Sequence, residues 1–197
     1  MSAVVTLRPD TLERMVRAVE NVRERLLRST AALEGAGLPY AVIGGNAVAA
    51  WVSQVDEGAV RNTRDVNILV RREDLPAVIR AMEAAGFEYA NVTGVDLFTD
   101  GPTGKPSQGV HLLYCDEVLK PNDPVTTPAI TESVAGEQYR FLTLEALVRM
   151  KLTSFRLKDQ VHLQDMIRVG LIDDTWLVRF PDVLAERLRE ILADPEG

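Results

Sequence analysis

Two oxygen-bearing side chains, Asp65 and Asn67, stand two positions apart in an otherwise apolar run. Alternation along a strand would place both on one face, with Val66 and Ile68 on the other. Carboxylate and amide oxygens held in this way can converge on a hard cation such as Mg²⁺. The alternative is an edge strand whose polar face meets solvent, and this alternative is favoured when the pair is taken alone.

A second candidate is the sequence Gly44-Gly45-Asn46, which follows the short apolar run 40–43. Glycines let the backbone approach a ligand closely, and the N-terminus of a helix offers free N–H groups to phosphate. We expect Asn46 to cap a helix that runs through about Val52. The alternative is a tight strand-to-helix turn that only needs a positive φ angle.

A third group of polar residues begins at Lys151 and continues through Arg156 to Asp165. Asp159, His162 and Asp165 are spaced three apart, so they fall near one face of a helix. This spacing is compatible with a metal site, but polar pairs along a helix face are the commoner explanation. Two basic clusters, 61–72 and 151–158, gain interest only if the fold brings them together.

The elements that must position these residues follow from periodicity and capping signals. Asp10, with Glu13 three places later, predicts the start of a helix that ends at Gly35 or Gly37. We expect strands at 40–43, 65–70, 87–92, 95–99 and 110–115, and helices at 46–52, 73–85, 143–155, 158–169 and from about 181. The segment 100–109 suits a long hairpin loop, and 120–128, with three prolines, is expected to be irregular. This order predicts an α+β fold around one mixed sheet.

Length and composition favour one domain, 1–197, made of an N-terminal helix (1–37), an α/β core (38–118) and a helical C-terminal part (141–193). The net charge of −7 argues against a protein that coats nucleic acid through its general field. The longest nearly apolar run is too short to span a bilayer, and Cys115 is the single cysteine. We therefore expect no membrane partner and a cytoplasmic location.

Taken together and in this order, the segments resemble the nucleotidyltransferase superfamily, and most closely its AbiEii-type branch, which includes toxins of bacterial toxin–antitoxin systems. Gly44-Gly45 resembles the first motif of that family, and 61–70 resembles the second, normally Arg-x-Thr-x-Asp-x-Asp before apolar residues. The segment 144–151, followed by Arg156 and Lys158-Asp159, resembles the C-terminal helical motifs. The resemblance covers roughly residues 38–167.

The resemblance implies transfer of an NMP group from an NTP to a hydroxyl of RNA, a protein or a small molecule, helped by Mg²⁺ or Mn²⁺. It implies a toxin–antitoxin setting, with a nucleotide, and RNA or a cognate antitoxin protein, as partners. The implied nucleotide-binding residues are Gly44, Gly45, Asn46, Arg61, Thr63 and Arg64. The implied catalytic residues are Asp65, His111, Lys151 and Asp159, and the implied metal ligands are Asp65 and Asn67.

Two departures from the family pattern weaken the implied metal site. Asn67 stands where the second metal carboxylate belongs, and His111 stands where the third is expected. Mg²⁺ prefers anionic oxygens, so its affinity should fall, although an amide oxygen can still coordinate and a neutral histidine can act as a base. The alternative function is therefore a catalytically impaired pseudo-nucleotidyltransferase, acting as a nucleotide-binding or protein-interaction module.

The resemblance also sets a spatial expectation for these residues. Gly44, Gly45, Asp65, Asn67 and His111 should converge in one cleft. The C-terminal helices should close over it, with Lys151 reaching inward, because a charge within an apolar helix stretch needs a partner or access to water.

Overall fold

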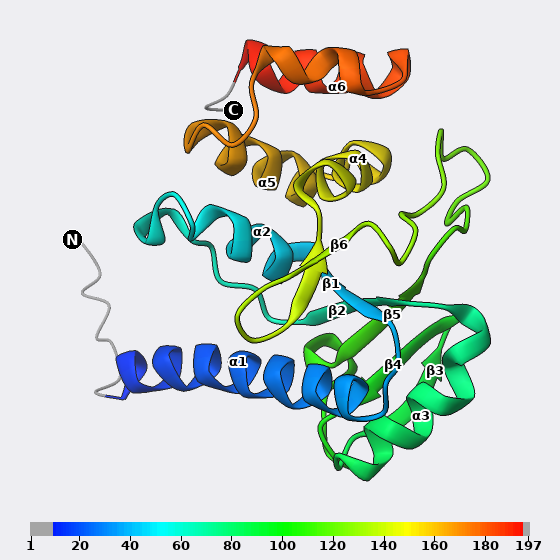
Figure 1. Cartoon of the computed structure of the whole chain (residues 1–197). Helices are drawn as coiled ribbons and strands as arrows, with labels where there is room; N and C mark the ends of the chain where they lie inside the picture. Colours follow the sequence, from blue (N-terminus) through cyan, green and yellow to red (C-terminus); the bar gives the residue numbers. More distant parts are fainter. Residues whose placement is uncertain (1–9, 195–197) are drawn as a thin grey trace.

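A computed structural model describes residues 10–194 and has the expected α+β architecture, a mixed sheet between two layers of helices (Figure 1). The sheet has the strand order β3-β4-β5-β2-β1-β7-β6. Its strands are β1 (Tyr40–Ile43), β2 (Val66–Val70), β3 (Glu88–Val92), β4 (Val95–Thr99), β5 (Val110–Tyr114), β6 (Ser133–Ala135) and β7 (Arg140–Leu142).

The centre of the sheet joins strands that are far apart in the sequence. β2 pairs antiparallel with β1 and parallel with β5, and this register sets Asn67 opposite His111. β7 then adds parallel to the other edge of β1, with Val42 opposite Phe141. The two strand segments that carry the candidate residues, β2 and β5, are therefore neighbours.

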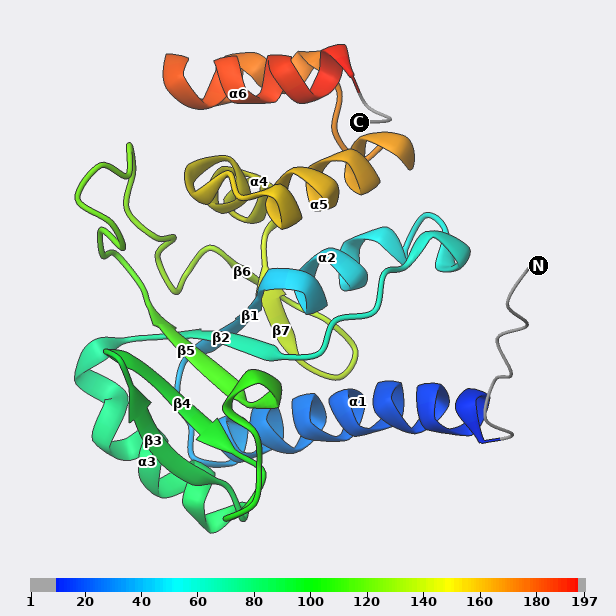
Figure 2. The same ribbon diagram turned by 180° about the vertical axis from the view of Figure 1, so that it is seen from behind.

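Helices cover both faces of the sheet, as the front and back views show (Figures 1 and 2). α1 and α3 lie on one face, while α2, α4 and α5 lie on the other and α6 packs outside α4 and α5. The helices are α1 (Thr11–Gly35), α2 (Gly44–Val52), α3 (Leu75–Ala84), α4 (Leu144–Ser154), α5 (Leu157–Arg168) and α6 (Asp182–Ala193). Within residues 10–194, no helix has both the length and the apolar character that a bilayer crossing requires.

Local signals explain where most of these helices begin and end. Thr143 caps α4 as predicted, since its hydroxyl accepts the backbone N–H of Ala146. Gly37 and Gly86, which follow α1 and α3, take the positive φ angles that favour glycine. Asp10 precedes α1 as predicted, but its side chain does not cap the helix, because the carboxylate accepts from Arg14 instead.

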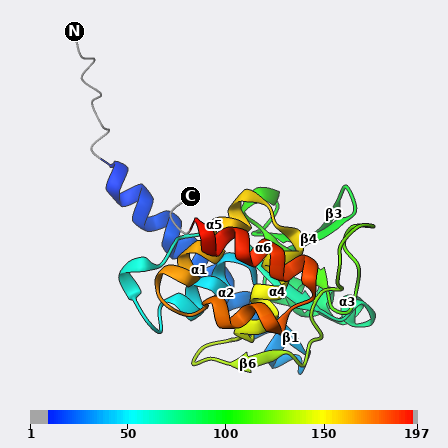
Figure 3. The same cartoon turned by 90° about the horizontal axis from the view of Figure 1, so that it is seen from above.

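The apolar stripe of α1 is buried only in its second half. Leu26 and Leu33 belong to the core, whereas Leu12, Met15 and Val16 are exposed. The view from above shows the reason, because the first half of α1 extends beyond the rest of the molecule (Figure 3). Helical spacing fixed the conformation of this segment but not what covers it.

Candidate functional site

One cleft of about 290 Å³ gathers most of the candidate residues. It opens between the β1–α2 turn, the start of β2, the irregular segment 119–127 and the corner between α4 and α5. Gly44, Gly45, Thr63, Asp65 and Asn67 line it from the sheet side. α4 and α5 supply its other wall, so these two C-terminal helices face the cleft, while α6 supplies no lining residue among those described.

The Gly-Gly turn is shaped by close backbone approach to β2. Gly44 has a φ angle of +68°, and an added Cβ would lie 3.2 Å from the Asn67 amide nitrogen. A Cβ on Gly45 would lie 3.0 Å from the Thr63 Cβ. α2 begins at this turn with no side-chain cap among the described residues and no acid in its first turn. Its first N–H groups are thus left for an anion.

Asn46 does not cap α2, so that prediction is wrong. It lies inside the first turn of the helix, buried, and its amide donates to the backbone carbonyl of Asp65 at 3.0 Å. This bond ties α2 to the start of β2. Asn46 therefore positions the two sheet-side elements of the cleft, and it is not one of the cleft-lining residues.

Asp65 lies at the centre of the sheet-side wall and both its oxygens are hydrogen-bonded. Thr63 donates its hydroxyl to Oδ1, and Asn67 donates its amide to Oδ2, each at 2.9 Å. Burial alone would raise the pKa of Asp65, but these two bonds and the charge of Lys158 outweigh it and lower the pKa. Asp65 is consequently a carboxylate at neutral pH.

His111 lies directly beside this pair. Its Nδ1 is 3.8 Å from Asp65 Oδ2, and its position opposite Asn67 on β5 puts it on the same sheet face. The imidazole is one-fifth exposed and does not itself line the cleft. The fold thus brings His111 next to Asp65, at a distance too long for a direct hydrogen bond.

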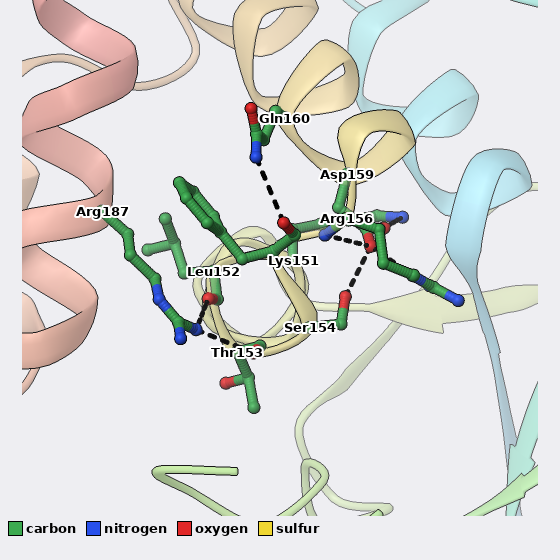
Figure 4. A network of polar contacts seen from close by, with 9 residues as sticks. Lys151, Leu152, Thr153, Ser154, Arg156, Asp159, Gln160 and Arg187 are labelled. Atoms are coloured by element: carbon green, nitrogen blue, oxygen red, sulfur yellow. Dashed lines mark hydrogen bonds and ion pairs between the residues drawn. The ribbon is translucent and has the colours of Figure 1, made fainter. Parts of the chain in front are cut away.

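Lys151 and Asp159 form a buried ion pair on the opposite wall (Figure 4). Lys151 Nζ donates to Asp159 Oδ1 at 2.7 Å, while Ser154 and Arg156 donate to Oδ2. Burial would raise the pKa of Asp159, but the hydrogen bonds and charges of Arg156 and Lys151 hold it far below its usual range. Such a carboxylate is a weak base, so Asp159 is better suited to orienting its hydrogen-bond donors than to accepting a proton.

The corner that carries this ion pair is held from both sides (Figure 4). Phe155 ends α4 with a φ angle of +44°, and its carbonyl accepts from the Gln160 amide. Arg187 of α6 donates to the Leu152 and Thr153 carbonyls and lies over the Phe155 ring. These contacts offset the unfavourable backbone of a non-glycine residue in the left-handed region. α6 therefore supports the cleft without touching it.

Besides Asn46, two further residues expected to bind a nucleotide lie outside the cleft. Arg61 pairs through two nitrogens with Asp165 of α5, at 2.6 and 3.1 Å. Asp165 also accepts from Arg168, so its burial is compensated by structural contacts. Arg64 is exposed and is not a lining residue. The residues of the Arg-x-Thr-x-Asp segment therefore have different roles. Thr63 and Asp65 face the cleft, whereas Arg61 links the segment before β2 to α5.

Three basic or ionisable residues of α5 and the α4–α5 corner were not assigned to the site from sequence. Arg156, Lys158 and His162 line the cleft together with Lys151. The basic cluster 151–158 was visible as a pattern, but a charged helix face is usually solvated and nothing local indicated which way it points. The spacing of His162 from Asp159 and Asp165 was compatible with a metal site on α5, but it did not indicate that His162 faces this cleft.

His162 gives a testable dependence of stability on pH. Burial, with the charge of Lys151, lowers its pKa from 6.5 to about 4, although Asp159 and Asp165 oppose this, and its Nδ1 has no partner among the described residues. The folded state therefore binds fewer protons than the unfolded state between these values, so stability falls as pH falls. From pH 7 to pH 5 the native chain should lose about 2 kcal/mol through His162.

Urea unfolding at the two pH values measures this loss. In His162→Gln the pH dependence of the free energy of unfolding that comes from His162 should vanish. The contribution of buried carboxylates remains in both proteins, so it cancels when they are compared. Equal pH dependence in the two chains would mean that His162 titrates normally. His111→Gln is the matched control, since His111 is the other histidine of the sequence.

The expected metal donors do not form a two-metal centre. Asp65 contributes one carboxylate, Asn67 turns its N–H rather than its oxygen toward that carboxylate, and the neighbouring His111 adds no anion. Within residues 10–194, no three or more His, Cys, Asp or Glu side chains are grouped to hold a metal ion. A pair of divalent cations normally needs several anionic oxygens, so this donor set fits at most one weakly held ion.

The arrangement of this sheet and its helices is similar to that of solved nucleotidyltransferase-like proteins. An antigenic nucleotidyltransferase-like protein from Paracoccidioides brasiliensis shares it with a TM-score of 0.59 and 17% identity, over 91% of each chain. A protein from H. pylori assigned as a nucleotidyltransferase shares it with a TM-score of 0.52 and 16% identity, over 90% of this chain and 78% of that one. Such identities establish the fold alone. No protein-family model and no curated protein matches the sequence.

Proposed function

We propose that the protein is a catalytically impaired member of this fold that binds a nucleotide in the cleft. One observation carries the proposal: an uncapped helix N-terminus and a cluster of cationic side chains face the same cleft, while the Asp65 carboxylate is bonded to an amide. The helix N-terminus and the cationic side chains suit a polyphosphate. The amide of Asn67 stands where metal-assisted transfer would need a second carboxylate.

The phosphate-binding part rests on two complementary walls. Gly44 and Gly45 start α2 without a side chain to block approach, and the positive end of a helix dipole favours an anion. Lys158 projects from the opposite wall and is exposed enough to move toward a ligand. Arg156 lines the same wall and is also exposed, although its Nε donates to Asp159. Lys151 is less available, because its ammonium is already paired with Asp159.

The impaired chemistry follows from Asn67. Metal-assisted transfer places a cation between adjacent carboxylates and the reacting phosphate, and loss of one anionic ligand weakens that stabilisation by several kcal/mol. Here the Asp65–Asn67 pair satisfies itself without a cation. The cleft is therefore better suited to binding a nucleotide than to transferring its NMP group.

Calorimetric titration with each NTP, with inorganic triphosphate and with the nucleosides tests this function. NTP and triphosphate should bind and the nucleosides should bind far more weakly. Gly45→Ala should weaken NTP binding about tenfold, since its methyl group meets Thr63 and narrows access to the helix N-terminus. The control is Gly35→Ala, where an added Cβ meets nothing within 4 Å. Absence of binding by every phosphorylated ligand would refute the proposal.

A second candidate is residual NMP transfer, favoured by the placement of His111 at 3.8 Å from Asp65. A neutral imidazole there can accept the proton of an attacking hydroxyl. The resemblance to the AbiEii-type branch adds RNA, a protein or a small molecule as acceptor and a cognate antitoxin as partner. Incubation with labelled NTP, Mg²⁺ or Mn²⁺ and total RNA tests it. A labelled acceptor that is lost in His111→Gln would favour transfer over binding alone.

A further inference from the structure

The cleft has its own positive charge. Among the described residues that line it, four side chains are cationic and three are carboxylates. The cations are Lys120, Lys151, Arg156 and Lys158, and the carboxylates are Asp65, Asp123 and Asp159. Lys151 and Arg156 neutralise Asp159 directly. The charges of Lys120 and Lys158 balance those of Asp65 and Asp123, so the lining as a whole carries one net positive charge without any added cation.

The only anion on the sheet-side wall, among those described, is already compensated. Both oxygens of Asp65 accept hydrogen bonds from neutral donors, Thr63 and Asn67. Two carboxylates at these positions would repel each other and would need a cation between them. An Asp65–Asn67 pair has no such requirement, because the amide N–H satisfies the oxygen that a metal would otherwise hold.

Lys158 supplies a mobile charge on the other side. It lies in the first turn of α5, is exposed, lines the cleft and acts electrostatically on Asp65. A lysine ammonium is a compact point charge on a flexible stem, so it can follow a phosphate without fixed coordination geometry. Because Lys158 and Asp65 line the same cleft, the ammonium is available to a phosphate that binds there.

We infer that the cleft binds a nucleoside polyphosphate as the free anion, with the Lys158 ammonium and the α2 N-terminus in place of the divalent cation. This inference rests on the proposed nucleotide binding and concerns the form of the ligand. A Mg²⁺-complexed nucleotide carries less negative charge than the free nucleotide. Its metal would meet a single carboxylate on the sheet-side wall, Asp65, whose oxygens are already hydrogen-bonded. The free anion is therefore the better match to this charge distribution.

Titration with ATP and with inorganic triphosphate in excess EDTA, and then in excess Mg²⁺, tests the inference. We expect binding in EDTA that is equal to or tighter than binding in Mg²⁺. Lys158→Gln should weaken binding in EDTA about tenfold, which corresponds to about 1.4 kcal/mol. The matched control is Lys105→Gln, because Lys105 is exposed in the β4–β5 loop and lines no part of the cleft.

The outcomes separate this inference from the function on which it rests. Binding that appears only with Mg²⁺ would overturn the inference and leave nucleotide binding intact. Equal affinity of the native chain and Lys158→Gln in EDTA would overturn the role of Lys158. No binding in either condition would overturn the proposed function itself. Unchanged thermal unfolding of both lysine variants is expected, since each side chain is exposed.

Discussion

Asp159→Asn is expected to lower the free energy of unfolding by about 3–5 kcal/mol, because it leaves the buried Lys151 ammonium without its counterion. Lys151 is 6% exposed and Asp159 1% exposed in their side chains. The amide N–H of the asparagine would also face Lys151, Ser154 or Arg156, which are themselves hydrogen-bond donors to this position. Urea unfolding followed by circular dichroism measures the change.

The matched control for this charge removal is Asp116→Asn at an exposed position, expected to stay within about 0.5 kcal/mol of the native chain. Adding Lys151→Met to Asp159→Asn should recover part of the lost stability, since no ammonium is then buried alone. If Asp159→Asn cost less than 1 kcal/mol, roughly the value of an exposed pair, the pair would not hold the α4–α5 corner.

Asn67→Asp is expected to make the cleft depend on a divalent cation. A second carboxylate beside Asp65 replaces a hydrogen bond by repulsion, so nucleotide affinity in EDTA should fall about tenfold or more. Mg²⁺ or Mn²⁺ should bind more tightly than to the native chain and should restore that affinity. If the cleft is a degraded catalytic site, any NMP transfer should also rise about 100-fold or more.

Calorimetric metal titration and a labelled-NTP transfer assay on both chains measure these changes. Asn21→Asp adds the same charge to an exposed position on α1, in the layer across the sheet, and should leave metal and nucleotide binding unchanged. A variant that binds neither metal nor nucleotide differently from the native chain would show that Asp65 and Asn67 do not contact the ligand. The protein-interaction module would then be the better explanation.

Local sequence determined most of the elements on which this site is built. The apolar run before Gly44 predicted β1, alternation predicted β2 with Asp65 and Asn67 on one face, and Thr143 predicted the start of α4. These signals depend on neighbours within one or two turns of backbone, so they survive in any tertiary setting. The pairing of one carboxylate, Asp65, with one amide, Asn67, could likewise be read from the sequence alone.

Pairing between distant segments was decided only by the tertiary structure. β6 and β7 are three residues each, too short for a periodic signal, and β7 completes the sheet against a strand about 100 residues earlier. The Arg61–Asp165 pair joins positions 104 apart and turned an expected nucleotide ligand into a link between layers. Asn46 became a tie to Asp65 rather than a helix cap.

The direction of the charged groups was also beyond the sequence. Whether Lys151 reaches water, a phosphate or Asp159 depends on the turn at Phe155, which Arg187 of α6 stabilises from another part of the chain. Likewise, Lys158 lines the cleft because α5 packs against α2, and the first turn of α2 lines the same cleft. The sequence determined which side chains were available for chemistry, and long-range packing determined which of them share a cleft, because a pattern specifies a face but not its partner.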